Sequence, residues 1–511
     1  MTRLRRGYGG LATAIAALAA LALATFGLVR GTWAVGGSDS SCYALMAQAM
    51  ASGDLQPSSA LAVEAPWPDA SRTLAPGGFI PSPVRPDAAS PICAPGMAVV
   101  MAPLAAIFGR DAIFWLVPLS GAVLVVSAFA IAHRLAGGMA GIVAAILTAT
   151  SPIVLYQVIQ PMNDVLAAAL WIAAAALLLR EGHIPAGLLI GVGILVRPNL
   201  APLTLVLAAA PFVLKHAQPM QSVARMIAAA VPGIVVMLWL NYELYGGPFA
   251  SGYGDASQLF SAANIGDNVR NFGRAIFQTQ NIVPVVGLLA PLVFRDDKRR
   301  LSIVLLVVAL VVTAIYALYQ PYPEWWYLRF LIPALVMLLI LASAVAVEIA
   351  TRVRMRGVVP IAAVLLAILG ARAAADRQTL ELPRLEGRYR ESAQLVAARL
   401  PANAVLITVW QSGSVRFHAN REAVMWDAMD PAWLDRAVTW LGSRGWQPYF
   451  LFERREEAEF RSRFRAHSEF GALDWPPRLD LNRQVRIYDP ADRSRYLAGE
   501  KYQTDSQPRR K

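Results

Sequence analysis

The chain has 511 residues, of which 56% are hydrophobic and only 16% are charged. That composition is too apolar for a soluble enzyme, and the length is too great for one domain. The formal net charge of +12 comes without a basic segment interleaved with aromatic residues, which argues against a nucleic-acid partner. Two cysteines are too few for a metal cluster or a disulfide scaffold.

The N-terminus places three arginines before an apolar run from Tyr8 to Val29. A signal peptide and a retained first membrane span are the two interpretations. The run exceeds the usual hydrophobic region of a signal peptide, which favours a retained span with its N-terminus in the cytoplasm.

A long loop, residues 31–95, follows this span. It is rich in Pro, Ser, Asp and Ala, and it holds no apolar run that could cross a bilayer. Later apolar segments bring the prediction to about eleven spans, some short enough that we expect tilting or burial in the bundle. These segments are 112–132, 138–156, 165–179, 184–196, 200–214, 226–242, 283–294, 301–319, 329–349 and 357–374.

The charges between the spans predict the orientation. With the N-terminus inside, the cytoplasmic connections carry clustered Lys and Arg, which is the positive-inside pattern. These residues are Arg134, Arg180, Lys215, Arg225, Arg295, Lys298, Arg299, Arg300, Arg352, Arg354 and Arg356. The pattern places the loop 31–95 outside the cell (inner) membrane, and an odd number of spans leaves the tail extracytoplasmic as well.

The composition changes near Asp376, where charges become dense and apolar runs shorten. We therefore predict a membrane domain over 1–375, a small soluble α/β domain over 376–500 and a disordered tail over 501–511. The α/β domain is predicted from strands at 404–410, 448–452 and 485–488 that alternate with helices at 431–445 and 456–465. Residues 412–414 follow the first strand, and a plain turn is favoured there over a ligand cradle.

Asp39 follows two glycines and precedes a helix-like segment, 43–50. Position alone favours a helix N-cap, because an Asp before a helix accepts hydrogen bonds from orphan backbone N–H groups. A catalytic role is compatible with a cap, since a helix N-terminus holds the carboxylate ionised. Ionised, Asp39 could accept a proton from an attacking hydroxyl.

Asp164 lies at the outer end of a predicted span, in the segment 160–164. A carboxylate so near hydrocarbon is costly and marks a candidate functional site. A helix cap at the interface is an equal alternative. The presence of a second acidic residue on the same side as Asp39 favours the functional interpretation.

Two arginines stand at the predicted outer interface. Arg197 belongs to Arg197-Pro198-Asn199, where the proline breaks a continuous apolar stretch. Arg329 lies in the aromatic segment 324–330, together with Tyr327. For either arginine alone, snorkelling to lipid head groups is the favoured interpretation. The functional alternative is a clamp on a phosphate leaving group, which a guanidinium fork suits.

The outer loop 241–254 is polar, aromatic and rich in glycine, and it carries Tyr245 and Tyr253. These tyrosines could stack on sugar rings, although an ordinary interfacial turn has the same composition. Cys42 and Cys93 both lie in the first outer loop. They could pair in an oxidising compartment, and two free buried thiols are an equal alternative.

No Walker motif, Rossmann glycine fingerprint or HExxH motif occurs in the sequence. The energy for a reaction must then come with the substrate, and a lipid-linked phospho-sugar meets that requirement.

The order of these elements resembles the GT-C superfamily, in particular enzymes similar to protein O-mannosyltransferases and the aminoarabinose transferases of lipid A. The resemblance reaches to about residue 350. The matching segments are Asp39 with 43–47 and 53–54, then 94–97, 162–164, 197–199, 241–254 and 327–333.

The resemblance implies a polytopic helix bundle, mainly α, that transfers a sugar with inversion. The donor would be a polyprenyl-phosphate-linked sugar, and the acceptor a lipid, glycan or protein hydroxyl. Asp39 matches the catalytic aspartate of the first loop, and Asp164 matches a second acidic position. The match of Arg329 to a phosphate ligand is looser. Arg197, Asn199, Tyr245, Tyr253 and Tyr327 complete the predicted substrate-binding set.

Two departures from the family pattern concern the first loop. Ala94 stands before Pro95-Gly96, where many relatives have an aromatic residue. Glu64 is the only glutamate of the loop, so the divalent metal ion of some GT-C enzymes is left open, and no cofactor or metal ligand is assigned.

Two other classes of protein remain open. A transporter or flippase of a lipid-linked substrate would place its charges near the bilayer midplane and form a cavity open to both sides. The candidate charges here gather at the outer interface, which favours the transferase. A non-catalytic protein whose tail binds cell-wall polymer is the third hypothesis.

Overall fold

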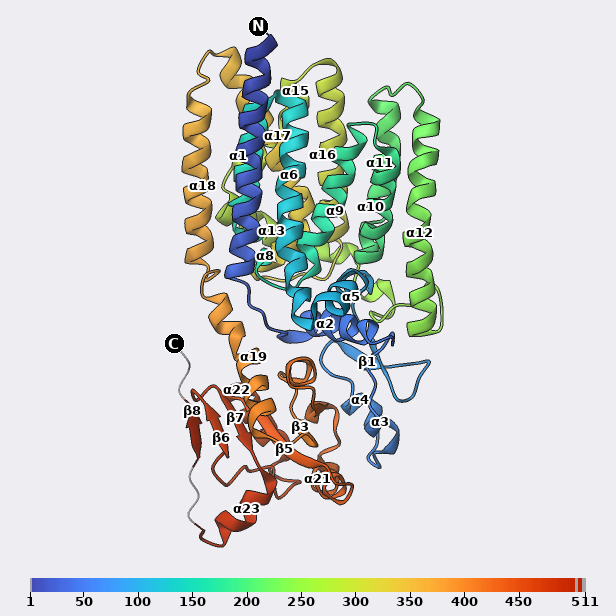
Figure 1. Cartoon of the computed structure of the whole chain (residues 1–511), viewed down its shortest axis with the longest axis vertical. Helices are drawn as coiled ribbons and strands as arrows, with labels where there is room; N and C mark the ends of the chain where they lie inside the picture. The colour runs from blue at the N-terminus through green and yellow to red at the C-terminus, as the bar shows by residue number, and fades with distance from the viewer. Residues whose placement is uncertain (1, 501–503, 508–511) are drawn as a thin grey trace. The chain divides into compact units, whose positions relative to one another are not determined.

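The computed structural model describes residues 2–500 and 504–507 (Figure 1). The fold is mainly helical with a small C-terminal sheet, as the sequence predicts. The chain divides into two compact units. The membrane unit contains the chain up to Gly31, with Phe114–Trp239 and Gly254–Leu382. The loop–tail unit contains Thr32–Ile113, Leu240–Tyr253 and the chain from Pro383 onwards.

Six helices in the described residues are long and apolar enough to cross a membrane, which makes this an integral membrane protein. They are built on α1 (Thr2–Val29), α6 (Leu116–Ala136), α12 (Pro219–Tyr245), α16 (Asp296–Ala317), α17 (Ile332–Arg352) and α18 (Val358–Asp376). The helices α7 (Gly138–Ala149) and α8 (Pro152–Val158), bent by 58° at the break between them, form either a seventh, broken span or a re-entrant loop. Pro152 opens α8 and cannot continue the hydrogen bonding of α7.

The predicted number of about eleven spans is higher than this count. Each predicted span coincides with helical structure, but besides the bent pair α7–α8 three single helices have 16 residues or fewer, fewer than a full crossing usually needs. They are α9 (Asn163–Leu178), α10 (His183–Val196) and α11 (Leu203–Val213). The predicted span 283–294 is two short helices, α14 (Val283–Leu288) and α15 (Ala290–Val293).

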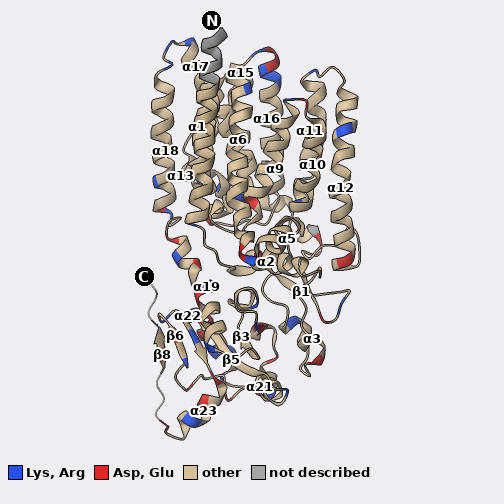
Figure 2. Cartoon of the chain, in the orientation of Figure 1, with Lys and Arg blue, Asp and Glu red and all other residues tan. Residues whose placement is uncertain are grey.

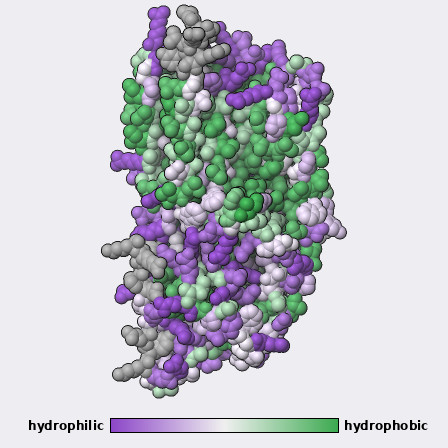
Figure 3. Space-filling model, in the orientation of Figure 1, coloured by the Kyte–Doolittle hydropathy of each residue, from purple (hydrophilic) through white to green (hydrophobic). Residues whose placement is uncertain are grey.

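The surface over the membrane-unit helices is a broad hydrophobic band (Figure 3), and their charged residues gather mainly toward the helix ends (Figure 2). Inside the unit, α17 is the most buried span. Small residues allow close helix packing. A Cβ on Gly233 of α12 would lie 2.4 Å from the carbonyl carbon of Gly191 in α10, so the two backbones touch.

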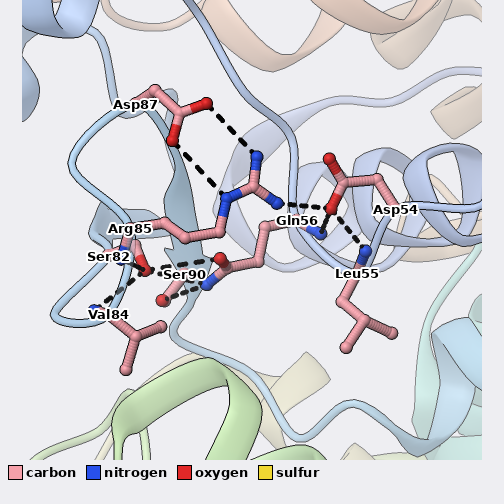
Figure 4. A network of polar contacts seen from close by, with 8 residues as sticks. All are labelled: Asp54, Leu55, Gln56, Ser82, Val84, Arg85, Asp87 and Ser90. Atoms are coloured by element: carbon pink, nitrogen blue, oxygen red, sulfur yellow. Dashed lines mark hydrogen bonds and ion pairs between the residues drawn. The ribbon is translucent and has the colours of Figure 1, made fainter.

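In the loop–tail unit, the first loop forms α2 (Gly37–Ala51), α3 (Leu61–Glu64), α4 (Ala70–Thr73) and a hairpin of β1 (Phe79–Pro81) and β2 (Ala89–Pro91). An apolar helix that the sequence analysis did not predict, α5 (Gly96–Phe108), follows. Arg85 fixes the hairpin between two carboxylates, with Nη1 donating to Asp54 Oδ1 at 2.6 Å and Nη2 to Asp87 Oδ2 at 3.2 Å (Figure 4). Gln56 reinforces it by donating to Ser90 Oγ at 2.7 Å.

The tail begins in α19 (Leu382–Arg399) and forms a six-stranded sheet in the order β4-β3-β5-β7-β6-β8. The strands are β3 (Ala404–Ile407), β4 (Glu422–Val424), β5 (Gln447–Glu453), β6 (Leu479–Leu481), β7 (Val485–Tyr488) and β8 (Asp505–Gln507). The pairs β3–β4, β3–β5 and β6–β8 are parallel, whereas β5–β7 and β6–β7 are antiparallel. The helices are α21 (Leu434–Ser443), α22 (Arg454–Phe464) and α23 (Pro490–Leu497).

The predicted strands and helices of the tail are present, with shifted ends. The strands β4, β6 and β8 have three residues each, too few for a recognisable alternating pattern. The predicted disorder over 501–511 does not extend to 505–507, because β8 pairs with β6. Thr504 is described and precedes β8, and the rest of that prediction, 501–503 and 508–511, lies outside the described residues.

One face of the tail sheet is covered by the first loop. Leu61, Trp67 and Leu74 of the loop share a buried core with Ile407 and Phe450 of the sheet. The backbone N–H of Met425 donates to Thr73 O at 2.6 Å, which joins the two chain segments. The first loop and the tail therefore fold together, although more than 300 residues separate them in sequence.

Candidate functional site

The membrane unit brings Asp164, Arg197 and Arg329 together. Arg197 Nη1 lies 2.8 Å from Asp164 Oδ1, and Arg329 Nη1 lies 3.9 Å from Asp164 Oδ2. Asp164 occupies the first turn of α9, and Arg197 follows the last residue of α10. The Asn163 side chain donates to Val196 O at 3.3 Å and so holds these two helix ends side by side.

Aromatic rings surround both guanidinium groups. The Phe330 ring lies 5.3 Å from the Arg197 guanidinium carbon and 5.1 Å from that of Arg329. Tyr316 adds a second ring to Arg197 at 5.6 Å, and Tyr327 adds one to Arg329 at 5.4 Å. Such distances give favourable cation–π contacts. Rings on both arginines restrict the guanidinium planes to fixed orientations.

Burial differs within the cluster. The Asp164 side chain is 0% exposed, whereas those of Arg197 and Arg329 are 11% and 14% exposed. The carboxylate is therefore the most deeply buried member of the cluster, and it lies beside both guanidinium groups.

Two further predicted residues belong to this cluster. Asn199 lies beside the Tyr316 hydroxyl, and Tyr327 stacks on Tyr322 with ring centroids 3.9 Å apart. Tyr316 was missed by the sequence analysis. The signal available was a tyrosine at every third position, 316, 319 and 322, at the end of an apolar run.

Asp39 lies in the loop–tail unit, at the third residue of α2. The helix cap is Gly36, so the interpretation of Asp39 as the N-cap is wrong. Two glycines in sequence let the helix begin earlier than the carboxylate, with Gly37 at a φ of +78°. Asp39 is half-buried while the following eight residues, 40–47, are buried. Asp39 therefore lies in the first turn of α2, at the N-terminal end of the helix.

A disulfide joins Cys42 of α2 to Cys93, with a Cα–Cα distance of 6.3 Å. It connects the Asp39 helix to the chain segment that enters α5. Gly78 packs against the same helix, because a Cβ there would lie 2.2 Å from Ser38 O. The position of Asp39 is thus set by covalent and packing contacts within the first loop.

The two predicted tyrosines of the loop 241–254 differ in accessibility. The Tyr245 hydroxyl donates to Pro91 O at 2.7 Å and so fixes the loop to β2. Gly252 is needed at the same contact, since a Cβ would lie 2.1 Å from Pro91 O. Tyr253 is 44% exposed. Tyr253 is therefore accessible at the surface of the loop–tail unit, whereas Tyr245 has a structural contact.

The predicted site residues thus fall into two groups. Asp164, Arg197, Asn199, Tyr327 and Arg329 belong to the membrane unit. The loop–tail unit contains the others, which are Asp39, Cys42, Cys93, Tyr245 and Tyr253. Within residues 2–500 and 504–507, no group of three or more His, Cys, Asp or Glu side chains could hold a metal ion.

Known proteins with a similar architecture are found among solved structures. No protein-family model and no curated protein sequence matches the chain. ArnT from Cupriavidus metallidurans, crystallised with undecaprenyl phosphate, matches with a TM-score of 0.57 at 16% identity, over 87% of this chain and 94% of that chain. The chain therefore has the same overall fold as ArnT.

The archaeal oligosaccharyltransferase AglB from Archaeoglobus fulgidus, in complex with an inhibitory peptide and a dolichol-phosphate, also matches. Its TM-score is 0.51 at 12% identity, over 91% of this chain and 71% of that chain. The predicted resemblance to GT-C proteins is confirmed for the fold. The match to ArnT covers 87% of this chain, so it extends beyond the first 350 residues into the tail.

Proposed function

We propose that the protein is a membrane glycosyltransferase that moves a sugar from a polyprenyl-phosphate donor to an acceptor hydroxyl. The observation that carries this proposal is the pair of arginines, Arg197 and Arg329, arranged around buried Asp164 in a GT-C fold. Solved proteins with this fold include one bound to undecaprenyl phosphate and one bound to a dolichol-phosphate. A lipid phosphate is therefore the ligand that the arginines are proposed to bind.

The arginine pair suits a phosphate leaving group. A guanidinium is planar, always charged and able to donate two parallel hydrogen bonds to phosphate oxygens. Donors held in advance by Asp164 and Phe330 do not need to reorganise as negative charge develops on the phosphate. Asp164 acts as a positioning residue, because its oxygens face the arginines and its side chain is 0% exposed.

Asp39 is the proposed general base. Its carboxylate takes the proton from the acceptor hydroxyl as the hydroxyl oxygen bonds to the anomeric carbon of the sugar. The bond between that carbon and the phosphate oxygen breaks with its electron pair, and polyprenyl phosphate leaves. A single displacement of this kind inverts the anomeric configuration. Half-burial and a place in the first turn of α2 suit a base that must meet the acceptor.

The orientation in the membrane is part of this proposal. The N-terminus is assigned to the cytoplasm, and the first loop and the α/β domain to the outer face of the cell membrane. The distribution of Lys and Arg between spans supports the assignment. The acceptor is then a lipid, glycan or protein hydroxyl outside the cytoplasm.

The test is incubation of the purified protein with a panel of polyprenyl-phosphate sugars and measurement of released polyprenyl phosphate. Release that depends on Asp39 and yields a product of inverted configuration supports the proposal. Movement of the intact donor across a vesicle membrane, without release of polyprenyl phosphate, would point to a flippase and overturn it.

A further inference from the structure

The segment that leads into the Asp39 helix is held by residues of the tail. The Val35 N–H donates to His418 Nε2 at 3.2 Å in a buried contact, and Arg390 donates to Trp33 O at 3.5 Å. Burial, with the nearby Arg390 and Arg110, lowers the pKa of His418 to about 3. The ring is therefore neutral at physiological pH and can accept the Val35 hydrogen bond.

The first turns of α2 also lie in van der Waals contact with the tail. A Cβ on Gly413 would lie 2.1 Å from Ser41 Oγ and 2.5 Å from Ser41 Cβ. A Cβ on Gly36 would lie 2.4 Å from the Tyr389 ring. Ser41 is only 1% exposed, so its short side chain has no open space into which to move. Neither glycine can gain a side chain unless α2 or the tail shifts.

The tail residues at this contact are fixed in turn. The Ser414 hydroxyl donates to Tyr389 O at 2.6 Å, and Gln411 donates to Glu453 Oε1 at 2.9 Å. Ser412 Oγ accepts the Gly77 N–H at 3.0 Å, which connects the same turn to the first loop. The segment 412–414, for which the sequence favours a plain turn over a ligand cradle, is thus a packing surface for α2.

We propose that the C-terminal α/β domain is a positioning device for the Asp39 carboxylate, acting through Gly413 against Ser41 and through His418 against Val35. This inference rests on the proposed role of Asp39 as general base. Ser41 is two residues from Asp39 on the same helical turn, so a shift at Ser41 moves the carboxylate. A misplacement of about 1 Å can lower a catalytic rate about a hundredfold.

Gly413→Ala is the direct test, made in the full-length protein. The added methyl displaces α2, and we expect kcat to fall about ten- to a hundredfold. The donor KM should stay unchanged, because the proposed phosphate ligands are not altered. A substitution that destabilised the whole protein would also change donor KM and lower the unfolding temperature.

The compensating variant is Ser41→Gly in the Gly413→Ala background. It removes the two atoms that the methyl would meet, and the next atom, Ser41 Cα, lies 3.5 Å away. We expect the double variant to recover most of the lost kcat. Failure of the double variant to recover activity, while Ser41→Gly alone is active, would overturn the proposal.

A second pair of variants tests the His418 contact independently. His418→Gln retains an acceptor for the Val35 N–H, whereas His418→Phe retains ring bulk without an acceptor. We expect kcat to be close to wild type in the first and lowered in the second. Equal kcat values in the two variants would count against the positioning role of His418.

Hydrogen exchange separates this inference from the proposed function. Amides of residues 36–46 should exchange faster in Gly413→Ala than in wild type, and the double variant should restore protection. This measurement needs no substrate. If wild type released no polyprenyl phosphate from any donor, the proposed function would fail, and exchange would still decide whether the tail holds α2. Unchanged exchange together with unchanged kcat in Gly413→Ala would refute the inference.

Discussion

Asp39 and Asp164 both occupy the first turn of a helix, yet their surroundings are opposite. Asp164 is 0% exposed and lies within 4 Å of two arginine side chains. Asp39 is half-buried at the start of a helix. A base must reach its acceptor, whereas a buried carboxylate in an ion pair stabilises the charges around it. The proposed roles follow this difference, with proton transfer proposed for Asp39 of the first loop and phosphate binding proposed for the arginines of the membrane unit.

Asp39→Asn should give the largest effect on activity. The substitution preserves size and the ability to form hydrogen bonds but removes the negative charge that accepts the proton. We expect kcat to fall by about 10²–10⁴, the usual contribution of general acid–base catalysis. The unfolding temperature should change little, because Asp39 is half-exposed. Rates of polyprenyl phosphate release and thermal unfolding of the same preparation measure both.

Asp69→Asn is the matched control in the first loop. Asp69 is exposed, and its φ of +54° is a conformation that Asn tolerates well. We expect wild-type turnover from this variant. Normal turnover by Asp39→Asn would show that Asp39 is not the base. The contrast in function between Asp39 and Asp164 would then fail.

Asp164→Asn should act mainly on stability. The change leaves two largely buried arginines without the carboxylate that they share. Removing one partner of a buried ion pair costs about 3–5 kcal/mol of folding free energy. We expect a lower unfolding temperature, partly restored by a polyprenyl phosphate that supplies negative charge to Arg197 and Arg329. Thermal unfolding with and without the lipid measures both effects.

Asp376→Asn is the control for this second variant. Its side chain is 65% exposed at the end of α18 and pairs weakly with Arg372 at 3.9 Å, so the cost should be within about 1 kcal/mol. An Asp164→Asn protein as stable as wild type would show that Asp164 is not needed to hold the arginines.

A third carboxylate sharpens the comparison, because Glu456 is fully buried and accepts hydrogen bonds from neutral N–H groups. Its Oε1 accepts from Val409 N and from Trp426 Nε1 at 3.0 Å. Burial raises the pKa of Glu456 to about 7, from an ordinary value of 4.5. Between these values the folded protein holds the proton that the unfolded chain has lost. This contribution to stability is present below pH 4.5 and is lost as the pH rises through 7.

Glu456→Gln should therefore flatten the fall in tail stability between about pH 5 and 7. Thermal unfolding followed by tryptophan fluorescence at several pH values measures this slope, since Trp426 contacts the group. Glu459→Gln, at an exposed position of the same helix, should keep the wild-type slope. Identical slopes in the Glu456→Gln variant and wild type would mean that Glu456 is ionised in the folded protein.

The parts of the site that sequence reasoning predicted are those with a local signal. Pro198 breaks an apolar run and places Arg197 and Asn199 at a helix end. The aromatic segment around Arg329 likewise marks an interface. The contact of Gly413 with Ser41 has no such signal, because it depends on packing between segments more than 300 residues apart. The lengths of the membrane helices also had no clear local signal, because short apolar helices and full spans have the same composition.

Arg329→Lys should give the smallest effect and divides the two interpretations of that arginine. A lysine keeps the charge but loses the planar fork and its packing against Phe330 and Tyr327. If Arg329 binds the donor phosphate, donor KM should rise about tenfold, equivalent to about 1.4 kcal/mol, with kcat less affected. Arg372→Lys, at a side chain 78% exposed on α18, should leave donor KM unchanged. If Arg329 only snorkels to lipid head groups, a lysine replaces it without loss. Equal donor KM values in Arg329→Lys and Arg372→Lys would then leave Arg197 as the only arginine proposed to bind the phosphate.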